Sequence, residues 1–117
     1  MRPPRSPITT HVLDTAEGRP ARGIAVKLEV ADRDGWTELG ASQTDEAGRV
    51  PDLLTRDTRL EARTYRLTFD TGTYFRAAGR PAFYPRVEVV FHVSSRDEHY
   101  HLPLLLSPFG YSTYRGS

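Results

Sequence analysis

Histidine and arginine are the side chains of this sequence best suited to acid–base chemistry and anion recognition. An imidazole titrates near neutral pH and can pass protons to or from water. The main candidates are His11, Arg49 and His101, which lie in separate segments of the chain. Two imidazoles and a guanidinium around a planar, anionic heterocycle would form a hydrolytic site. One imidazole would activate water, and Arg49 would hold the substrate or the developing oxyanion.

Each of these residues also has a purely structural interpretation. A single surface histidine is usually solvated, and so is an arginine that follows a turn. His99 and His101 form an H-x-H pair that could bind zinc or copper, but no thiol or carboxylate follows at a suitable spacing. His92 alternates with apolar neighbours, which favours a structural role. No G-x-S-x-G motif surrounds a serine, so a serine nucleophile is weakly supported.

The composition is that of one ordinary globular domain. The chain has 117 residues, of which 38% are apolar and 26% charged, and its net charge is +1. This balance argues against nucleic acid or an anionic membrane as a partner. Cysteine is absent, which excludes disulfides and a cysteine nucleophile and fits a reducing compartment. No apolar run approaches the ~20 residues of a membrane span.

The first seven residues differ from the rest of the chain. Residues 1–7 are positively charged and rich in proline, and we expect them to form a short disordered leader. They have no apolar segment, so they do not resemble a secretory signal. The remaining residues, 8–117, show no repeat or linker and are expected to form a single domain.

An apolar period of two dominates the chain and predicts β-strands. Apolar side chains alternate along "GIAVKLEV" (23–30), "ARTYRLTF" (62–69) and "PRVEVVFHV" (85–93). The segments "DRDG" (32–35) and "DEAG" (45–48) predict tight turns, because glycine readily adopts a positive φ.

Two further elements complete the predicted fold. Arg49 is expected to begin a short strand that Pro51 ends. A helix of about two turns is expected where Asp70 or Thr71 could cap its start and Gly79 could close its end. The whole pattern predicts an all-β sandwich of seven to eight strands with one short helix.

The alternation in "HYHLPL" (99–104) predicts where its histidines point. Successive side chains of a strand face opposite sides of the sheet. If Tyr100 and the leucines pack inward, both histidines of this segment face outward. The pattern of "ITTHVLD" (8–14) leaves the face of His11 open. A sandwich of this size cannot enclose a ring-shaped substrate in its core, so an outer-face site would need a second subunit as its roof.

Three separated motifs of the chain form a recognisable set. The first is "ITTHVLDTAEGRPARGIAVKLE" (8–29), and the second is "TDEAGRV" (44–50). The third joins "HYHLPLLLSPFGYST" to the final "YRGS" (99–117). Together with "FYPRVEVVF" (83–91), these motifs resemble the transthyretin-related 5-hydroxyisourate hydrolases of purine degradation, and the resemblance covers nearly the whole chain.

The resemblance implies a fold, an assembly and a reaction. The fold would be a transthyretin-like sandwich, assembled as a homotetramer with active sites where dimers meet. The reaction would convert 5-hydroxyisourate to 2-oxo-4-hydroxy-4-carboxy-5-ureidoimidazoline without a metal or organic cofactor. The family has peroxisomal members, but the ending of this chain is not of the Ser-Lys-Leu type, so we expect a cytoplasmic location. The catalytic residues that the resemblance implies are His11, Arg49 and His101. The substrate-binding residues that it implies are Tyr114, Arg115, Gly116 and Ser117.

Two other functions compete with the hydrolase. A transthyretin-type carrier would bind a small molecule in the same channel without hydrolysing it. A stand-alone interaction domain would pair an exposed edge strand with a partner. The two histidines, Arg49 and the final tetrapeptide favour the hydrolase over the carrier.

Overall fold

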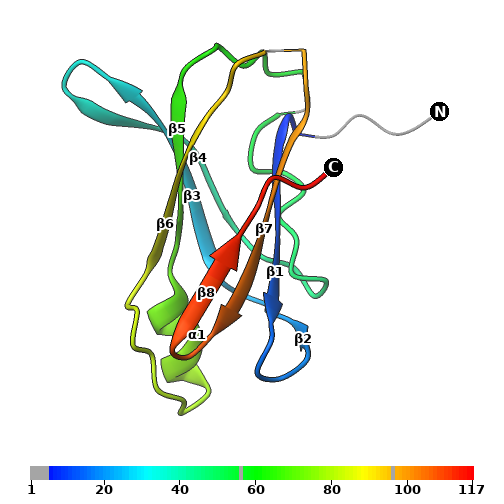
Figure 1. The fold of residues 1–117 in the computed structure, drawn as a ribbon, viewed down its shortest axis with the longest axis vertical. Helices are drawn as coiled ribbons and strands as arrows, with labels where there is room; N and C mark the ends of the chain where they lie inside the picture. Colours follow the sequence, from blue (N-terminus) through cyan, green and yellow to red (C-terminus); the bar gives the residue numbers. More distant parts are fainter. Residues whose placement is uncertain (1–5, 56, 96) are drawn as a thin grey trace.

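The computed structural model describes residues 6–55, 57–95 and 97–117. Within these residues the chain forms eight strands and one helix, arranged as two four-stranded sheets packed face to face (Figure 1). The elements in chain order are β1 (Ile8–Asp14), β2 (Arg19–Pro20), β3 (Ala25–Asp32), β4 (Gly35–Gln43), β5 (Thr64–Phe69), α1 (Thr71–Ala77), β6 (Val87–His92), β7 (Tyr100–Ser107) and β8 (Gly110–Thr113). The predicted transthyretin-like sandwich with one short helix is confirmed. No helix among the described residues is long and apolar enough to cross a membrane.

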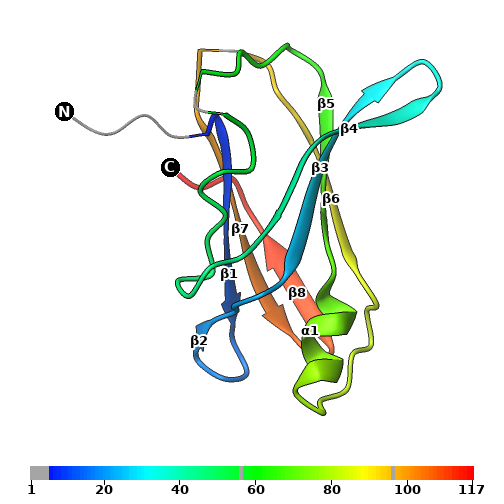
Figure 2. The same ribbon diagram turned by 180° about the vertical axis from the view of Figure 1, so that it is seen from behind.

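Strands from the two ends of the sequence meet in one sheet. Its order is β2-β1-β7-β8, and the order of the other sheet is β4-β3-β5-β6. β1 and β7 pair in parallel, whereas the other pairs are antiparallel. Seen from behind, the long connection from β4 to β5 runs beside β1, while α1 lies at one end of the sandwich (Figure 2). The β4–β5 connection therefore lies along β1 of the sheet β2-β1-β7-β8.

The core forms where the alternating apolar side chains of the two sheets meet. In one of the sheets, Val26 and Leu28 of β3 lie beside Phe69 and Leu67 of β5 on the neighbouring strand. All four side chains are almost completely buried. The prediction that these side chains share an inward face is confirmed. Each such side chain contributes roughly 1.5–3 kcal/mol by its removal from water.

The predicted turns and helix ends are also confirmed. Gly35, with φ of 130°, closes the hairpin between β3 and β4, and Gly48, with φ of 77°, ends the turn before Arg49. The Asp70 carboxylate caps α1 by accepting a hydrogen bond from the Thr73 amide at 3.3 Å. Gly79 follows the helix with φ of 68°.

Two details differ from the sequence prediction. Arg49 makes only an isolated bridge to His11 instead of starting a short strand, because the chain turns at once and Pro51 has no amide hydrogen to donate. Residues 1–5 of the expected leader lie outside the described residues. Ser6 and Pro7 are described, and both contact the sandwich: the Ser6 hydroxyl donates to the Ile8 carbonyl, and the Pro7 carbonyl accepts from the Tyr100 amide.

A fully buried carboxylate anchors the end of β1 to the helical segment. Asp14 accepts hydrogen bonds from the Tyr74 hydroxyl at 2.8 Å and from the Arg80 guanidinium at 2.7 Å. The backbone amides of Ala16 and Glu17 donate to the same carboxylate. Burial alone would raise the pKa of Asp14, but these hydrogen bonds and the Arg80 charge lower it to about 2.

The depressed pKa of Asp14 predicts a loss of stability in acid. The folded protein favours the ionised carboxylate, so this contribution of about 2 kcal/mol is present above pH 4 and disappears as the pH falls through 2. We expect Asp14→Asn to lower the free energy of unfolding at pH 7 by at least that amount, and the gap to the wild type to narrow between pH 4 and 2. Guanidinium unfolding at a fixed protein concentration measures this difference. A gap that does not change with pH would contradict the role of the charge.

Candidate active site

The pairing of β1 with β7 places the two histidines on one face of a sheet. Their parallel register sets Thr9 beside His101 and His11 beside Pro103. Along β1, every second residue is buried, whereas Thr9, His11 and Leu13 face the other side. His101 also faces away from the core, as predicted, while Tyr100 on its flank is buried. The structure thus fixes the face of His11, which the sequence pattern left open.

A turn from the β4–β5 connection brings Arg49 to this face. The Asp45 carboxylate organises the turn by accepting hydrogen bonds from the amides of Ala47 and Arg49, both at 2.9 Å. The turn packs tightly on β1, where the Val12 amide donates to the Gly48 carbonyl at 2.8 Å. A β-carbon at Gly48 would lie 2.4 Å from the Val12 carbonyl oxygen, so only glycine permits this approach.

The surroundings of His11 favour its neutral form. Burial lowers the pKa of His11, and the nearby Arg49 charge lowers it further. A hydrogen bond at the Ala47 backbone and the Asp45 charge oppose this shift but do not reverse it. The lowered pKa favours the neutral imidazole of His11, which is the form that can accept a proton.

Removal of the Arg49 charge should raise the pKa of His11. We expect NMR titration of wild-type protein to show a His11 midpoint below the ordinary 6.5, and Arg49→Gln to move it upward. Arg86→Gln is the matched control, because Arg86 pairs with Glu88 on the other sheet. An unchanged His11 midpoint in Arg49→Gln would show that the guanidinium does not act on this imidazole.

The C-terminal segment returns to β7 beside His101. β8 ends at Thr113, but Gly116 makes a further bridge to His101, with its amide donating to the His101 carbonyl at 2.7 Å. A β-carbon at Gly116 would lie 2.7 Å from Cδ2 of the imidazole. Gly116 therefore lets the backbone pack directly against the His101 ring.

These segments surround a cavity of about 380 Å³, within the roughly 300–1,000 Å³ typical of small-molecule sites. Its lining residues are Thr9, Thr10, Arg49, Val50, Pro51, His101 and Ser117. The cavity thus offers a guanidinium that binds anions and carbonyl oxygens, an imidazole and several hydroxyls. His11 adjoins it through the bridge to Arg49 but is not one of these lining residues.

The other two residues of the final tetrapeptide lie beside a second hollow. Tyr114 and Arg115 line a space of about 310 Å³ between β6 and β7. The Arg115 guanidinium stacks over the Tyr100 ring at 4.4 Å and lies 3.5 Å from a Glu98 carboxylate oxygen. A larger hollow of about 430 Å³ beside the β4–β5 connection contains no histidine. Within one chain, therefore, His101, Arg49, Gly116 and Ser117 come together, while Tyr114 and Arg115 lie next to them.

Sequence reasoning did not single out Thr9 as a site residue. Its hydroxyl oxygen lies 2.9 Å from ring nitrogens of both His99 and His101. The signal was present in the sequence, because Thr9 is two residues from His11 and must share its face in a strand. Among the described residues, no group of three or more histidine or acidic side chains could hold a metal ion.

The fold and the cavity together define a class of protein: a small transthyretin-like β-sandwich with a histidine- and arginine-containing cavity on the outer face of one sheet. The chain belongs to the HIUase/Transthyretin family, which it matches over residues 8–116. It is 49% identical to the 5-hydroxyisourate hydrolase of Mus musculus over 114 residues, which are 96% of each chain.

Two solved structures are similar over nearly the whole fold. Klebsiella pneumoniae 5-hydroxyisourate hydrolase has a TM-score of 0.83 and 36% identity, covering 94% of this chain and 97% of that one. Sea bream transthyretin in complex with thyroxine has a TM-score of 0.88 and 36% identity, covering 95% of both chains. The fold is thus shared by an enzyme and by a thyroxine-binding protein, and the side chains of the site must distinguish them.

Proposed function

We propose that this protein hydrolyses 5-hydroxyisourate to 2-oxo-4-hydroxy-4-carboxy-5-ureidoimidazoline in urate degradation. The observation that carries the proposal is the cavity in which His101 and Arg49 lie together, with His11 adjoining Arg49. The 49% identity to the mouse 5-hydroxyisourate hydrolase over almost the entire chain supports the same function.

The proposed mechanism is histidine-assisted attack of water on a ring amide. One imidazole, of His101 or His11, takes a proton from water as the water oxygen bonds to the carbonyl carbon. Arg49 orients the substrate through paired hydrogen bonds and stabilises the developing oxyanion. The C–N bond then breaks, and the leaving nitrogen receives a proton from an imidazolium. Tyr114, Arg115, Gly116 and Ser117 remain the predicted substrate-binding residues.

The proposal includes a homotetramer with sites where dimers meet. The cavity lies on the outer face of a sheet and is open on one side, so a second copy of the chain would supply the missing wall. A small-molecule site normally buries 70–90% or more of its ligand, which an open face alone does not provide. Light scattering coupled to gel filtration tests this: a monomer would contradict it. A cytoplasmic location is also proposed, supported by the absence of cysteine.

The decisive experiment is a direct assay of the reaction. Urate oxidase generates 5-hydroxyisourate from urate, and the ultraviolet absorbance reports its decay. We expect added protein to accelerate the decay well beyond the spontaneous rate, in proportion to protein concentration. Decay at the spontaneous rate would reject the hydrolase.

A carrier function is the second candidate, favoured by the TM-score of 0.88 to a transthyretin solved with thyroxine. The discriminating feature is the set formed by His11, Arg49 and His101, which acid–base catalysis needs and ligand carriage does not. Calorimetric titration with thyroxine complements the assay. Tight thyroxine binding by a protein that does not accelerate the decay would establish the carrier.

A further inference from the structure

The hydroxyl of Thr9 joins two histidines on the outer face of the sheet. Its oxygen lies 2.9 Å from Nδ1 of His101 and 2.9 Å from Nε2 of His99. These short contacts follow from the fold, because the parallel register of β1 and β7 sets Thr9 directly beside His101. Thr9 also lines the same cavity as His101.

Thr9 and Gly116 contact two edges of the His101 ring. Nδ1 faces Thr9, and Cδ2 packs against Gly116, where an added β-carbon would come within 2.7 Å. Because Thr9 contacts Nδ1, Nε2 is the other nitrogen through which His101, a lining residue of the cavity, can exchange a proton.

The orientation of the Thr9 hydroxyl controls the chemistry of Nε2. A threonine hydroxyl has one hydrogen and can donate it to only one imidazole at a time. If it donates to His99, neutral His101 donates its own Nδ1–H to Thr9, and Nε2 carries a lone pair. If it donates to Nδ1 of His101, neutral His101 carries its hydrogen on Nε2 and cannot act as a base there.

Only the first orientation is compatible with proton transfer to His101. When Nε2 takes a proton from water, both nitrogens of the ring carry hydrogen, so Nδ1 must donate. In the first orientation, hydrogen bonds run from His101 to Thr9 and from Thr9 to His99, so Nδ1 is already a donor before the reaction. In the reverse orientation, two hydrogens would face each other until the hydroxyl rotated. The first orientation needs no reorganisation during the reaction, which is the property of preorganised sites.

We propose that Thr9 is a positioning residue that keeps the hydrogen of neutral His101 on Nδ1 and thereby makes Nε2 the general base. The inference rests on the proposed hydrolase function and assigns the base that the mechanism above leaves open. Thr9 neither gains nor loses a proton overall. Nε2 takes one from water as the new C–O bond forms, and the imidazolium returns it to the leaving nitrogen as the C–N bond breaks.

Three variants test this role by kinetics. Thr9→Val removes the hydroxyl at nearly constant volume, and we expect kcat to fall roughly 10-fold with little change in KM. Thr9→Ser keeps the hydroxyl and should recover most of kcat. Thr15→Val is the matched control, because the Thr15 hydroxyl donates to the Leu106 carbonyl at the other end of β1. Unchanged kcat in Thr9→Val would overturn the proposal.

A spectroscopic readout separates this inference from the proposed function. Nitrogen-15 NMR of histidine-labelled protein distinguishes the two neutral tautomers of His101. We expect the Nδ1–H form in the wild type and in Thr9→Ser, and a shift toward the Nε2–H form in Thr9→Val. A wild type that carries the hydrogen on Nε2 would refute the role of Thr9. This measurement needs no turnover, so it decides the tautomer even if the hydrolysis assay fails.

Discussion

A His101→Asn variant is expected to fold like the wild type and to lose roughly 10²–10⁴-fold in kcat for 5-hydroxyisourate, the usual contribution of a general acid–base group. His101 lies at the cavity on the outer face of its sheet, so its replacement leaves the core unchanged. Asparagine keeps a hydrogen-bonding side chain beside Thr9 but cannot take up a proton near neutral pH. The assay is the ultraviolet decay of 5-hydroxyisourate, with guanidinium unfolding as the measure of stability.

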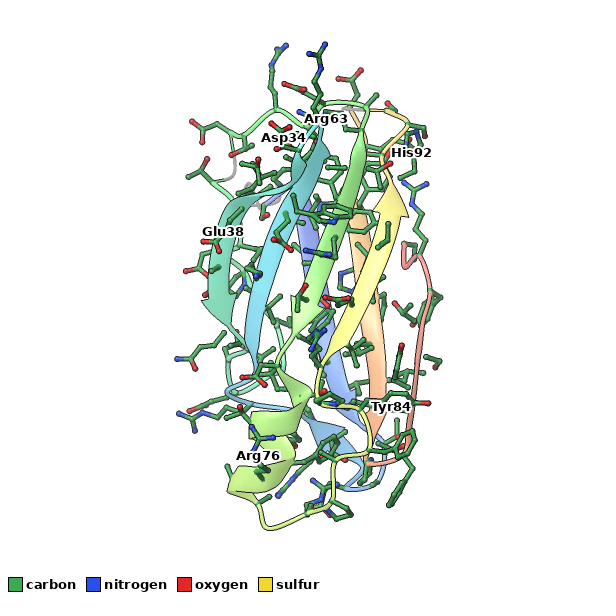
Figure 3. All side chains as sticks on the ribbon, turned by 90° about the vertical axis from the view of Figure 1, so that its left-hand side faces the viewer. Asp34, Glu38, Arg63, Arg76, Tyr84 and His92 are labelled. Atoms are coloured by element: carbon green, nitrogen blue, oxygen red, sulfur yellow. The ribbon has the colours of Figure 1, made fainter. Side chains whose placement is uncertain are left out.

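His92 provides a matched control for this substitution. It is the exposed last residue of β6 on the other sheet (Figure 3), and it lines the second hollow instead of the cavity that contains His101. We expect His92→Asn to retain wild-type kcat and stability. Wild-type kcat in His101→Asn would remove His101 from the mechanism, whatever the behaviour of the control.

Deletion of residues 114–117 should have a comparably large effect, with at least a roughly 10²-fold loss of kcat. The deletion removes Ser117 from the cavity and Gly116 from its contact with the His101 ring. It also removes the hydrogen bond at 2.7 Å from the Gly116 amide to the His101 carbonyl. Misplacement of a catalytic group by about 1 Å can cost a factor of 10², so a freed His101 would react poorly. Circular dichroism should still show a folded β protein, because β8 ends at Thr113.

Gly116→Val tests the same segment by a single substitution, in the event that the deletion disturbs folding. Gly116→Val introduces a side chain where even a β-carbon would lie 2.7 Å from His101, and it should also lower kcat strongly. Gly110→Ala is its control, because the nearest atom to a β-carbon there is the Ser107 hydroxyl oxygen at 3.8 Å. If both the deletion and Gly116→Val turn over normally, the C-terminal segment is not part of the site.

Much of the fold was predictable because its strands alternate cleanly. Apolar periodicity identified β3, β5 and β6, and the same parity placed His101 on an outer face, as the structure confirms. The face of His11 was not predictable, since Thr9 and Thr10 precede it and have the same polarity. The structure shows why they differ: Thr10 is buried and donates its hydroxyl hydrogen to the Leu102 carbonyl, whereas Thr9 contacts the histidines.

Contacts between distant residues account for what the sequence did not reveal. A buried Asp14 is unexpected until its partner Arg80, 66 positions away, is known. Tyr114 and Arg115 line the second hollow and not the cavity that contains His101. This hollow forms between strands of different sheets, so the sequence does not reveal it.

Because β1 and β7 pair in parallel, the cavity forms only when the two ends of the chain have come together. Thr9 and His101 are 92 positions apart, so an incompletely synthesised or incompletely refolded chain without this contact lacks the cavity and should be inactive. Such long-range strand pairing is slow, because the entropy of closing a large loop must be overcome first. During refolding, turnover should therefore return with or after the last fluorescence phase of Trp36, and never before it.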